Sequence, residues 1–145
     1  MFHGSYDHVL DDKGRTSLPK ELRLELARFE GEPWLIALAQ CLAIYPAPDF
    51  EAIQRELSRV SKLNASAQQL KRLITGMAVR CPIDRQGRIL IPPKARSWAS
   101  LERQIVFAGV GEHIEIWDRA RHHTELERIR ENYDAYTRDL GDFEL

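Results

Sequence analysis

Residues 11–19 read Asp-Asp-Lys-Gly-Arg-Thr-Ser-Leu-Pro, and residues 84–92 read Asp-Arg-Gln-Gly-Arg-Ile-Leu-Ile-Pro. Both stretches fit the pattern D-x-x-G-R-x-x-[L/I]-P, and they lie 73 residues apart in a chain of 145. Arg23 and Arg96 extend the match by four more positions. A repeat of this length predicts two copies of one small structural unit, related by an approximate two-fold axis.

The length of the chain limits how independent these two units are. A half of roughly 70 residues is close to the lower limit for a separate hydrophobic core. Apolar residues make up 43% of the sequence, which is ordinary for a globular protein. We therefore expect the halves to share a core, to associate with other copies, or both.

Local patterns predict the same order of elements in each half. Both turns combine an Asp that can accept backbone amides with a Gly that supplies positive φ. Helical spacing predicts short helices after Pro19 and Pro92, two linking helices, a cap near Asn64, and a final helix capped by Asp118 over 119–139. Alternating or apolar stretches predict strands over 3–10, 15–18, 34–39, 41–45, 77–83, 89–91, 104–108 and 113–117.

Charge is distributed unevenly along the chain. The formal net charge of −1 argues against a generic nucleic-acid binder. However, residues 80–96 carry five bases and one acid, whereas residues 102–145 carry 11 acids and 6 bases. A local basic patch balanced by an acidic tail indicates a polyanionic partner on one side of the molecule.

The repeated motif places an acid and an arginine four residues apart across a glycine turn. Asp11 and Arg15 form the first pair, and Asp84 and Arg88 form the second. The acid can accept the turn amides and hold the arginine by a forked pair, which fixes the direction of the guanidinium. Such an arginine suits phosphate oxygens or the major-groove edge of guanine. The alternative is a hairpin in which the pair only stabilises the turn.

Other kinds of site have weaker support in the sequence. Asp11 and Asp12 are neighbours whose side chains point to opposite faces of a strand end, and no catalytic motif is present, so we do not expect an enzyme. His122 and His123 cannot share one helix face, and His113 is alone, so we expect neither metal nor cofactor. Cys41 and Cys81 are predicted to be reduced packing thiols in a soluble, cytoplasmic protein.

Longer motifs resemble those of a known family. The opening M-F-x-G-x-Y-x-H-x-L-D-D-K-G-R-x-S-L-P, the later Y-P-x-P-x-F-E and the second D-x-x-G-R-x-L-I-P-P with E-I-W-D are similar to the MraZ family of bacterial transcriptional regulators. The resemblance covers about residues 1–135. It implies an α+β fold with tandem swapped-hairpin AbrB-like βαββ repeats that form a pseudo-two-fold β-barrel core. The expected parts are SpoVT–AbrB-like repeats at 5–48 and 77–120, a helical linker at 49–76, and a C-terminal helix and tail at 121–145.

The same resemblance implies a function. It implies a ring-like homo-oligomer, associated with the nucleoid, that binds repeated boxes in double-stranded promoter DNA and regulates the division and cell-wall gene cluster. No membrane partner is expected. The alternatives are a ring-forming protein-interaction module and an antitoxin-like AbrB protein. The expected DNA-binding residues are Lys13, Arg15, Arg85 and Arg88, and the expected loop-positioning residues are Asp11, Gly14, Asp84 and Gly87.

Overall fold

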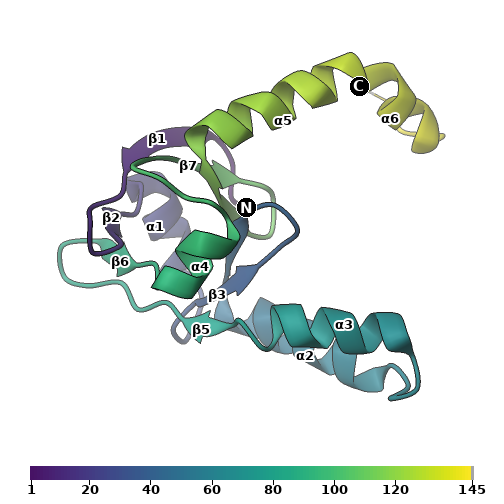
Figure 1. Ribbon diagram of the computed structural model, residues 1–145, viewed down its shortest axis with the longest axis horizontal. Coiled ribbons are helices and arrows are strands. Elements are labelled where there is room, and N and C mark those ends of the chain that lie inside the picture. Colours follow the sequence, from purple (N-terminus) through teal and green to yellow (C-terminus); the bar gives the residue numbers. More distant parts are fainter. Residues whose placement is uncertain (145) are drawn as a thin grey trace.

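The two halves of the chain contain the same order of elements, as their sequences predict (Figure 1). The computed structural model describes residues 1–144. The first half contains β1 (Ser5–Val9), β2 (Arg15–Ser17), α1 (Lys20–Leu26), β3 (Trp34–Ala37) and β4 (Leu42–Tyr45), followed by α2 (Ala47–Arg59) and α3 (Ala65–Ile74). The second contains β5 (Val79–Arg80), β6 (Arg88–Leu90), α4 (Pro93–Trp98), β7 (Gln104–Gly109) and β8 (Ile114–Asp118), followed by α5 (Arg119–Glu131) and α6 (Tyr133–Asp139).

Strands of the two halves are exchanged across one antiparallel sheet. Its order is β1-β7-β8-β4-β3-β5, so β1 of the first half pairs with β7 of the second, and β5 of the second half pairs with β3 of the first. β2 and β6 pair with each other in a separate two-stranded sheet. Each half therefore supplies strands that complete the sheet of the other.

The expected β-barrel is not closed, although the α+β class is confirmed. The six-stranded ladder ends at β1 and β5, and β5 spans only Val79–Arg80 instead of the predicted 77–83. Met77 lies in the turn that follows α3, where its amide donates to the carbonyl oxygen of Leu73 at 3.1 Å. Pro82 has no amide to donate to a ladder. So short an edge strand offers few groups with which a barrel could close.

The two halves share their larger hydrophobic core, which is one of the outcomes that their small size predicts. Leu22 of α1 and Ala95 of α4 are buried together with strand residues from both halves, such as Phe107. Cys41 and Cys81 are free and buried, and burial raises the pKa of each thiol to about 12. Their predicted role as packing thiols is confirmed.

The linking helices α2 and α3 lie side by side and project from the sheet (Figure 1). They are joined by a hydrogen bond of 3.0 Å from Thr75 Oγ1 to Gln54 Oε1. The predicted cap of α3 is confirmed, because Asn64 Oδ1 accepts from the amide of Ala67 at 3.0 Å.

The final helix is capped as predicted but is not continuous. Asp118 Oδ2 accepts from the amide of Arg121 at 3.2 Å at the start of α5. The helix breaks at Asn132, whose Nδ2 donates to the carbonyl oxygen of Arg128 at 2.8 Å. An Asn side chain that bonds the backbone competes with helical hydrogen bonding, which accounts for the division into α5 and α6.

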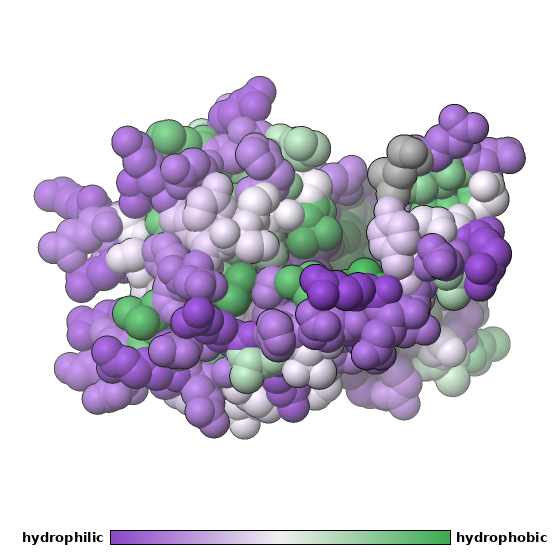
Figure 2. All heavy atoms as spheres, turned by 90° about the horizontal axis from the view of Figure 1, so that it is seen from above, coloured by the Kyte–Doolittle hydropathy of each residue, from purple (hydrophilic) through white to green (hydrophobic). Residues whose placement is uncertain are grey.

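The outer surface differs between the two ends of the molecule. The β2–β6 ribbon and α6 lie at opposite ends of the longest axis (Figure 1). Seen from above, hydrophilic side chains cover most of the face, and small apolar groups also show at the end that carries α6 (Figure 2). No helix among the described residues is long and apolar enough to cross a membrane. The exposed apolar side chains of α5, α6 and the following residues are Leu126, Ile129, Tyr133, Tyr136, Leu140 and Phe143.

Candidate nucleic-acid interface

The β2–β6 ribbon has one buried face and one exposed face. Its central pair is Thr16 and Ile89, which are 3% and 2% exposed and point toward the core. Side chains alternate between the two faces of a strand, so the residues on either side point outward. The outward-facing residues are Arg15, Ser17, Arg88 and Leu90, in the pairs Arg15–Leu90 and Ser17–Arg88. Both motif arginines therefore lie on one face of the ribbon.

The first motif forms a turn that is closed by its aspartate. Asp11 Oδ1 accepts from the backbone amides of Lys13 at 2.9 Å and Arg15 at 2.8 Å. Asp11 Oδ2 accepts from Nε of Arg15 at 2.9 Å. The amide of Gly14 donates to the carbonyl oxygen of Asp11 at 3.0 Å. One carboxylate thus fixes both the turn and the arginine that follows it.

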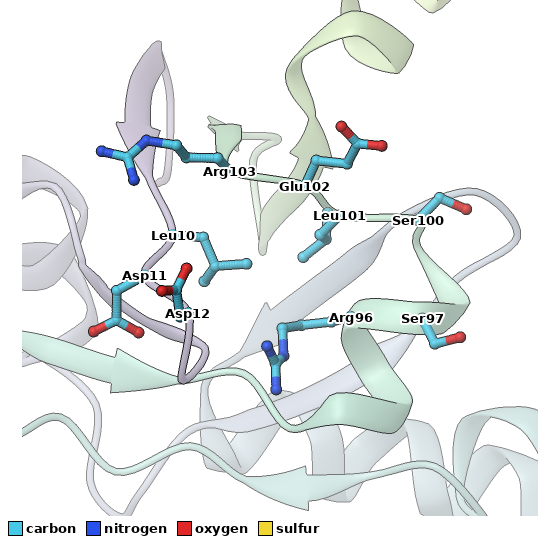
Figure 3. Close-up of a pocket in the computed structure, with 9 residues that line it drawn as sticks. All are labelled: Leu10, Asp11, Asp12, Arg96, Ser97, Ser100, Leu101, Glu102 and Arg103. Carbon is cyan, nitrogen blue, oxygen red and sulfur yellow. The ribbon is translucent and has the colours of Figure 1, made fainter.

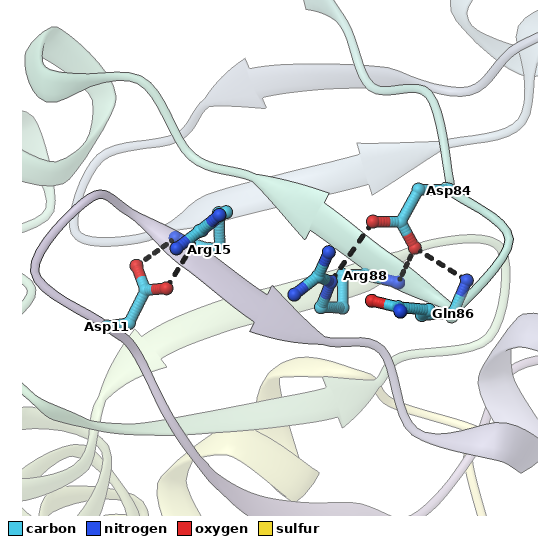
Figure 4. A network of polar contacts seen from close by, with 5 residues as sticks. All are labelled: Asp11, Arg15, Asp84, Gln86 and Arg88. Carbon is cyan, nitrogen blue, oxygen red and sulfur yellow. Dashed lines mark hydrogen bonds and ion pairs between the residues drawn. The ribbon is translucent and has the colours of Figure 1, made fainter.

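The second motif repeats this arrangement (Figure 4). Asp84 Oδ1 accepts from the amides of Gln86 at 2.8 Å and Arg88 at 2.9 Å, and Oδ2 accepts from Nε of Arg88 at 3.1 Å. The amide of Gly87 donates to the carbonyl oxygen of Asp84 at 3.0 Å. The structure therefore confirms that the repeated sequence specifies a repeated geometry.

Each arginine is held by a single nitrogen and not by the forked pair that the sequence suggested. In each motif, Oδ1 of the aspartate accepts from backbone amides, and Oδ2 accepts from Nε of the arginine alone. Among the described residues, nothing bonds the Nη nitrogens of Arg15 or Arg88, which carry four of the five guanidinium donors. The two side chains are 45% and 39% exposed. The orientation of each guanidinium is fixed while most of its donors are left for a partner.

Hydrogen bonding also fixes the charge of the two carboxylates. The pKa of Asp11 is lowered mainly because the backbone amide of Arg15 donates to it, and the pKa of Asp84 is lowered in the same way by the amide of Arg88. Both carboxylates are ionised at neutral pH, and their oxygens are already occupied. They suit the positioning of an arginine better than proton transfer.

The turn glycines have a conformation that other residues rarely adopt. Gly14 has φ +86° and Gly87 has φ +78°. A Cβ at Gly14 would also collide with the carbonyl oxygen of Ile91 in the other half. The backbone angles and the close packing of these glycines both support the predicted loop-positioning role, which stays a prediction.

Histidines, possible metal ligands and a pocket lie outside the β2–β6 ribbon. His113 Nε2 lies 3.2 Å from Glu115 Oε2, and its ring stacks on Tyr45 with centroids 4.7 Å apart. Over residues 1–144, no group of three His, Cys, Asp or Glu side chains could hold a metal ion. A pocket of about 540 Å³ beside the first turn is lined by acidic, basic and hydroxyl side chains, among them Asp12, Arg96 and Ser100 (Figure 3).

Comparison with known proteins finds the same division into two halves. The family model described as "MraZ protein, putative antitoxin-like" matches the chain twice, over residues 1–73 and 74–143. The chain belongs to the MraZ family. It is similar to proteins named "Transcriptional regulator MraZ" from Methylococcus capsulatus (42% identical, over 81% of this chain and 79% of the relative) and Nitrosomonas eutropha (40%, over 88% and 87%). The protein of that name from Pediococcus pentosaceus is 34% identical over the whole of both chains.

In this MraZ-family chain, the residues expected to bind DNA lie on one ribbon and its turns. Lys13 is exposed in the first turn and Arg85 in the second, beside the two motif arginines. Whether these four side chains bind DNA stays a prediction. Sequence reasoning gave no role to Arg23 and Arg96, although both belong to the repeat. The signal was the match itself, which extends beyond the turn into the helix that follows.

Proposed function

We propose that the protein is a DNA-binding transcriptional regulator that recognises repeated promoter boxes through the β2–β6 ribbon and its two turns. Relatives that match most or all of its length are named transcriptional regulators, which supports this class of function. The resemblance to the MraZ family further suggests that the target is the division and cell-wall gene cluster. The oligomer proposed to bind these boxes is ring-like.

The observation that carries the proposal is the pair of arginines held by carboxylates on one exposed ribbon face. Arg15 and Arg88 occupy diagonal positions of the β2–β6 ladder, where side chains lie roughly 7–8 Å apart. The major groove is about 12 Å wide and accepts a two-stranded ribbon. Two guanidiniums with free donors at this spacing suit phosphates or guanine edges within one groove.

Charge and shape support a multivalent mode of binding. With a net charge of −1, one protomer offers few phosphate contacts, and each is weak at physiological salt. A ring of identical ribbons on DNA with boxes at matching spacing multiplies these contacts through effective concentration. Uncovered apolar side chains on α5 and α6 are the kind of surface that subunit contacts bury.

We also propose that residues 5–48 and 77–120 form two SpoVT–AbrB-type domains of swapped-hairpin topology. The exchanged pairs β1–β7 and β3–β5 support this assignment. In the proposed complex, the ribbon faces DNA and the C-terminal helix α6 lies away from it. The ribbon and α6 lie at opposite ends of the molecule, which agrees with such an orientation (Figure 1).

The proposal is tested by measuring the anisotropy of labelled duplex DNA from the region upstream of the protein's own gene, over a range of salt concentrations. Arg15→Ala and Arg88→Ala each remove donors aimed at the groove, so each is expected to weaken specific binding by about 1–3 kcal/mol for each base that the arginine reads. The slope of log affinity against log salt should also become shallower, by about 0.9 for each phosphate that the variant no longer neutralises.

Arg59→Ala is the matched control. Arg59 is the last residue of α2, is 76% exposed and is paired with Glu56. Helix α2 lies away from the ribbon (Figure 1). The substitution Arg59→Ala changes the net charge by the same amount as Arg15→Ala or Arg88→Ala. Equal losses for Arg59→Ala and Arg15→Ala, or unchanged binding of the ribbon variants in an oligomer of normal size, would remove the ribbon from the interface.

A second candidate is an antitoxin-like protein, which the wording of the family description favours. Such a protein would bind a toxin as well as DNA. Purification of the tagged chain from a strain carrying its native chromosome, followed by mass spectrometry, distinguishes the two. A stoichiometric small partner that is toxic when expressed alone would support the antitoxin.

A further inference from the structure

Arg23 and Arg96 each lie against the turn of the opposite half. Arg23 belongs to α1, yet a Cβ built on Gly87 of the second turn would collide with its Nη1 and lie 2.9 Å from its Cζ. Arg96 belongs to α4, and a Cβ on Gly14 of the first turn would lie 3.0 Å from its Nε and 3.1 Å from its Cζ. Each guanidinium therefore fills the space that the Cβ of any other residue would need at that glycine.

Backbone hydrogen bonds cross between the halves at the same places. The amide of Leu18, just before α1, donates to the carbonyl oxygen of Gly87 at 2.9 Å. The amide of Ile91, just before α4, donates to the carbonyl oxygen of Gly14 at 2.8 Å. Each turn is thus held by the strand end and helix of the other half.

Neither guanidinium has a polar partner that would explain its position. Among residues 1–144, no hydrogen bond or ion pair is made by the side chain of Arg23 or Arg96, and Nε of Arg96 is buried without a partner. Figure 3 shows Arg96 reaching from α4 toward the turn that carries Asp11 and Asp12. What the arginine provides there is a flat, rigid group that packs over a residue without a side chain.

We infer that Arg23 and Arg96 are crossed positioning residues for the two arginine loops. Arg23 holds the turn at 84–88 and so orients Arg88, whereas Arg96 holds the turn at 11–15 and so orients Arg15. The helix of one half therefore determines the position of the arginine loop of the other half. This inference deepens the proposed DNA-binding function, and only its DNA-binding consequence rests on that function.

Hydrogen–deuterium exchange of the intact protein without DNA tests the crossed packing directly. The hydrogen-bonded amides of the first turn are those of Asp11, Lys13, Gly14 and Arg15. Those of the second turn are the amides of Asp84, Gln86, Gly87 and Arg88. Arg23→Ala should speed exchange at the second set by about tenfold and leave the first set unchanged, because only local opening is affected. Arg96→Ala should do the reverse.

The two variants act as controls for each other. A third variant serves as the test if an alanine variant fails to fold. Arg23→Lys keeps the charge but lacks the planar group, so it should retain the overall fold and show the same crossed change to a smaller degree. Faster exchange in the turn of the mutated half, or an equal increase in both turns, would overturn the inference. Unchanged exchange in both turns would also overturn it.

Binding to the upstream duplex gives a second readout. If Arg23 acts through Arg88, the loss in Arg23→Ala/Arg88→Ala should be smaller than the sum of the single losses, whereas Arg23→Ala and Arg15→Ala should add. Additive losses for both pairs would remove the positioning role. Failure of Arg15→Ala and Arg88→Ala to weaken binding would instead refute the proposed function and leave the DNA-free exchange result standing.

Discussion

Single residues in the turns combine unusual backbone angles with close packing. Gly14 and Gly87 both have positive φ, but their neighbours differ. A side chain at Gly14 would meet a backbone oxygen of Ile91, which cannot move alone, whereas one at Gly87 would meet the guanidinium of Arg23, which a rotation of that side chain can displace. The two glycines should therefore differ in their tolerance of alanine.

Alanine substitutions at three glycines separate these effects. Gly111 also has positive φ, at +79°, but no atom would lie within 4 Å of a Cβ there. Gly111→Ala should lower the free energy of unfolding by about 1–2 kcal/mol, which is the cost of the left-handed backbone conformation for alanine. Gly14→Ala should lose clearly more, and Gly87→Ala an intermediate amount, in urea titrations followed by circular dichroism. Equal losses at Gly14 and Gly111 would show that the crossed packing contributes nothing.

The sequence predicted the residue-scale geometry only where it is local. Asp11 and Arg15 are close in the chain, and their pairing across the turn is confirmed. The forked pair was wrong, because backbone amides compete for the same carboxylate. The positions of Arg23 and Arg96 could not be predicted, because they depend on which half supplies the neighbouring turn.

At the scale of elements, the buried centre of the β2–β6 ribbon differs between the two halves. Thr16 is buried, and its Oγ1 has no hydrogen-bond partner among the described residues. The equivalent position in the second half is Ile89, which is apolar and lies directly opposite. A buried hydroxyl without a partner costs about 1–3 kcal/mol.

Thr16→Val should therefore stabilise the protein by about 1 kcal/mol, because it removes the unpaired hydroxyl and keeps the shape. The measurement is the free energy of unfolding in denaturant. Ile89→Thr is the reverse change and should destabilise. A loss of stability in Thr16→Val would indicate that the hydroxyl has a partner, such as an ordered water.

Elements with strong local signals were predicted well. The caps of Asn64 and Asp118 are confirmed, and the strands predicted at 104–108 and 113–117 are found within one residue at each end. The predicted strand at 77–83 was too long, because Met77 lies in the turn that follows α3. The break at Asn132 was missed, because the spacing of apolar residues continues through it.

At the scale of the whole molecule, exchanged strands make the halves dependent on each other. Within residues 1–144, β1 pairs only with β7, β5 only with β3, and β2 only with β6. A half on its own leaves these strands without partners and opens the shared core. Strand exchange was expected only from the family resemblance, since a repeat in a sequence does not reveal which copy a strand pairs with.

Cutting the chain in the exposed connection between α2 and α3 tests this dependence. Leu63 there is 95% exposed, so fragments 1–62 and 63–145 separate at a position with little packing. Neither fragment alone should unfold cooperatively as a monomer, whereas an equimolar mixture should regain the circular dichroism spectrum and cooperative melting of the intact chain. A single fragment that melts cooperatively as a monomer would contradict the shared core.

Covalent fusion of the two halves has a consequence for the direction of the ribbon. A dimer of identical hairpins is symmetric, and its operators are palindromic for that reason. Here the turn tips differ: Asp12-Lys13 in one corresponds to Arg85-Gln86 in the other, and Ser17 corresponds to Leu90. On the proposed function, the ribbon has a polarity along the duplex, so a box need not read the same on both strands and can itself determine which way each protomer points.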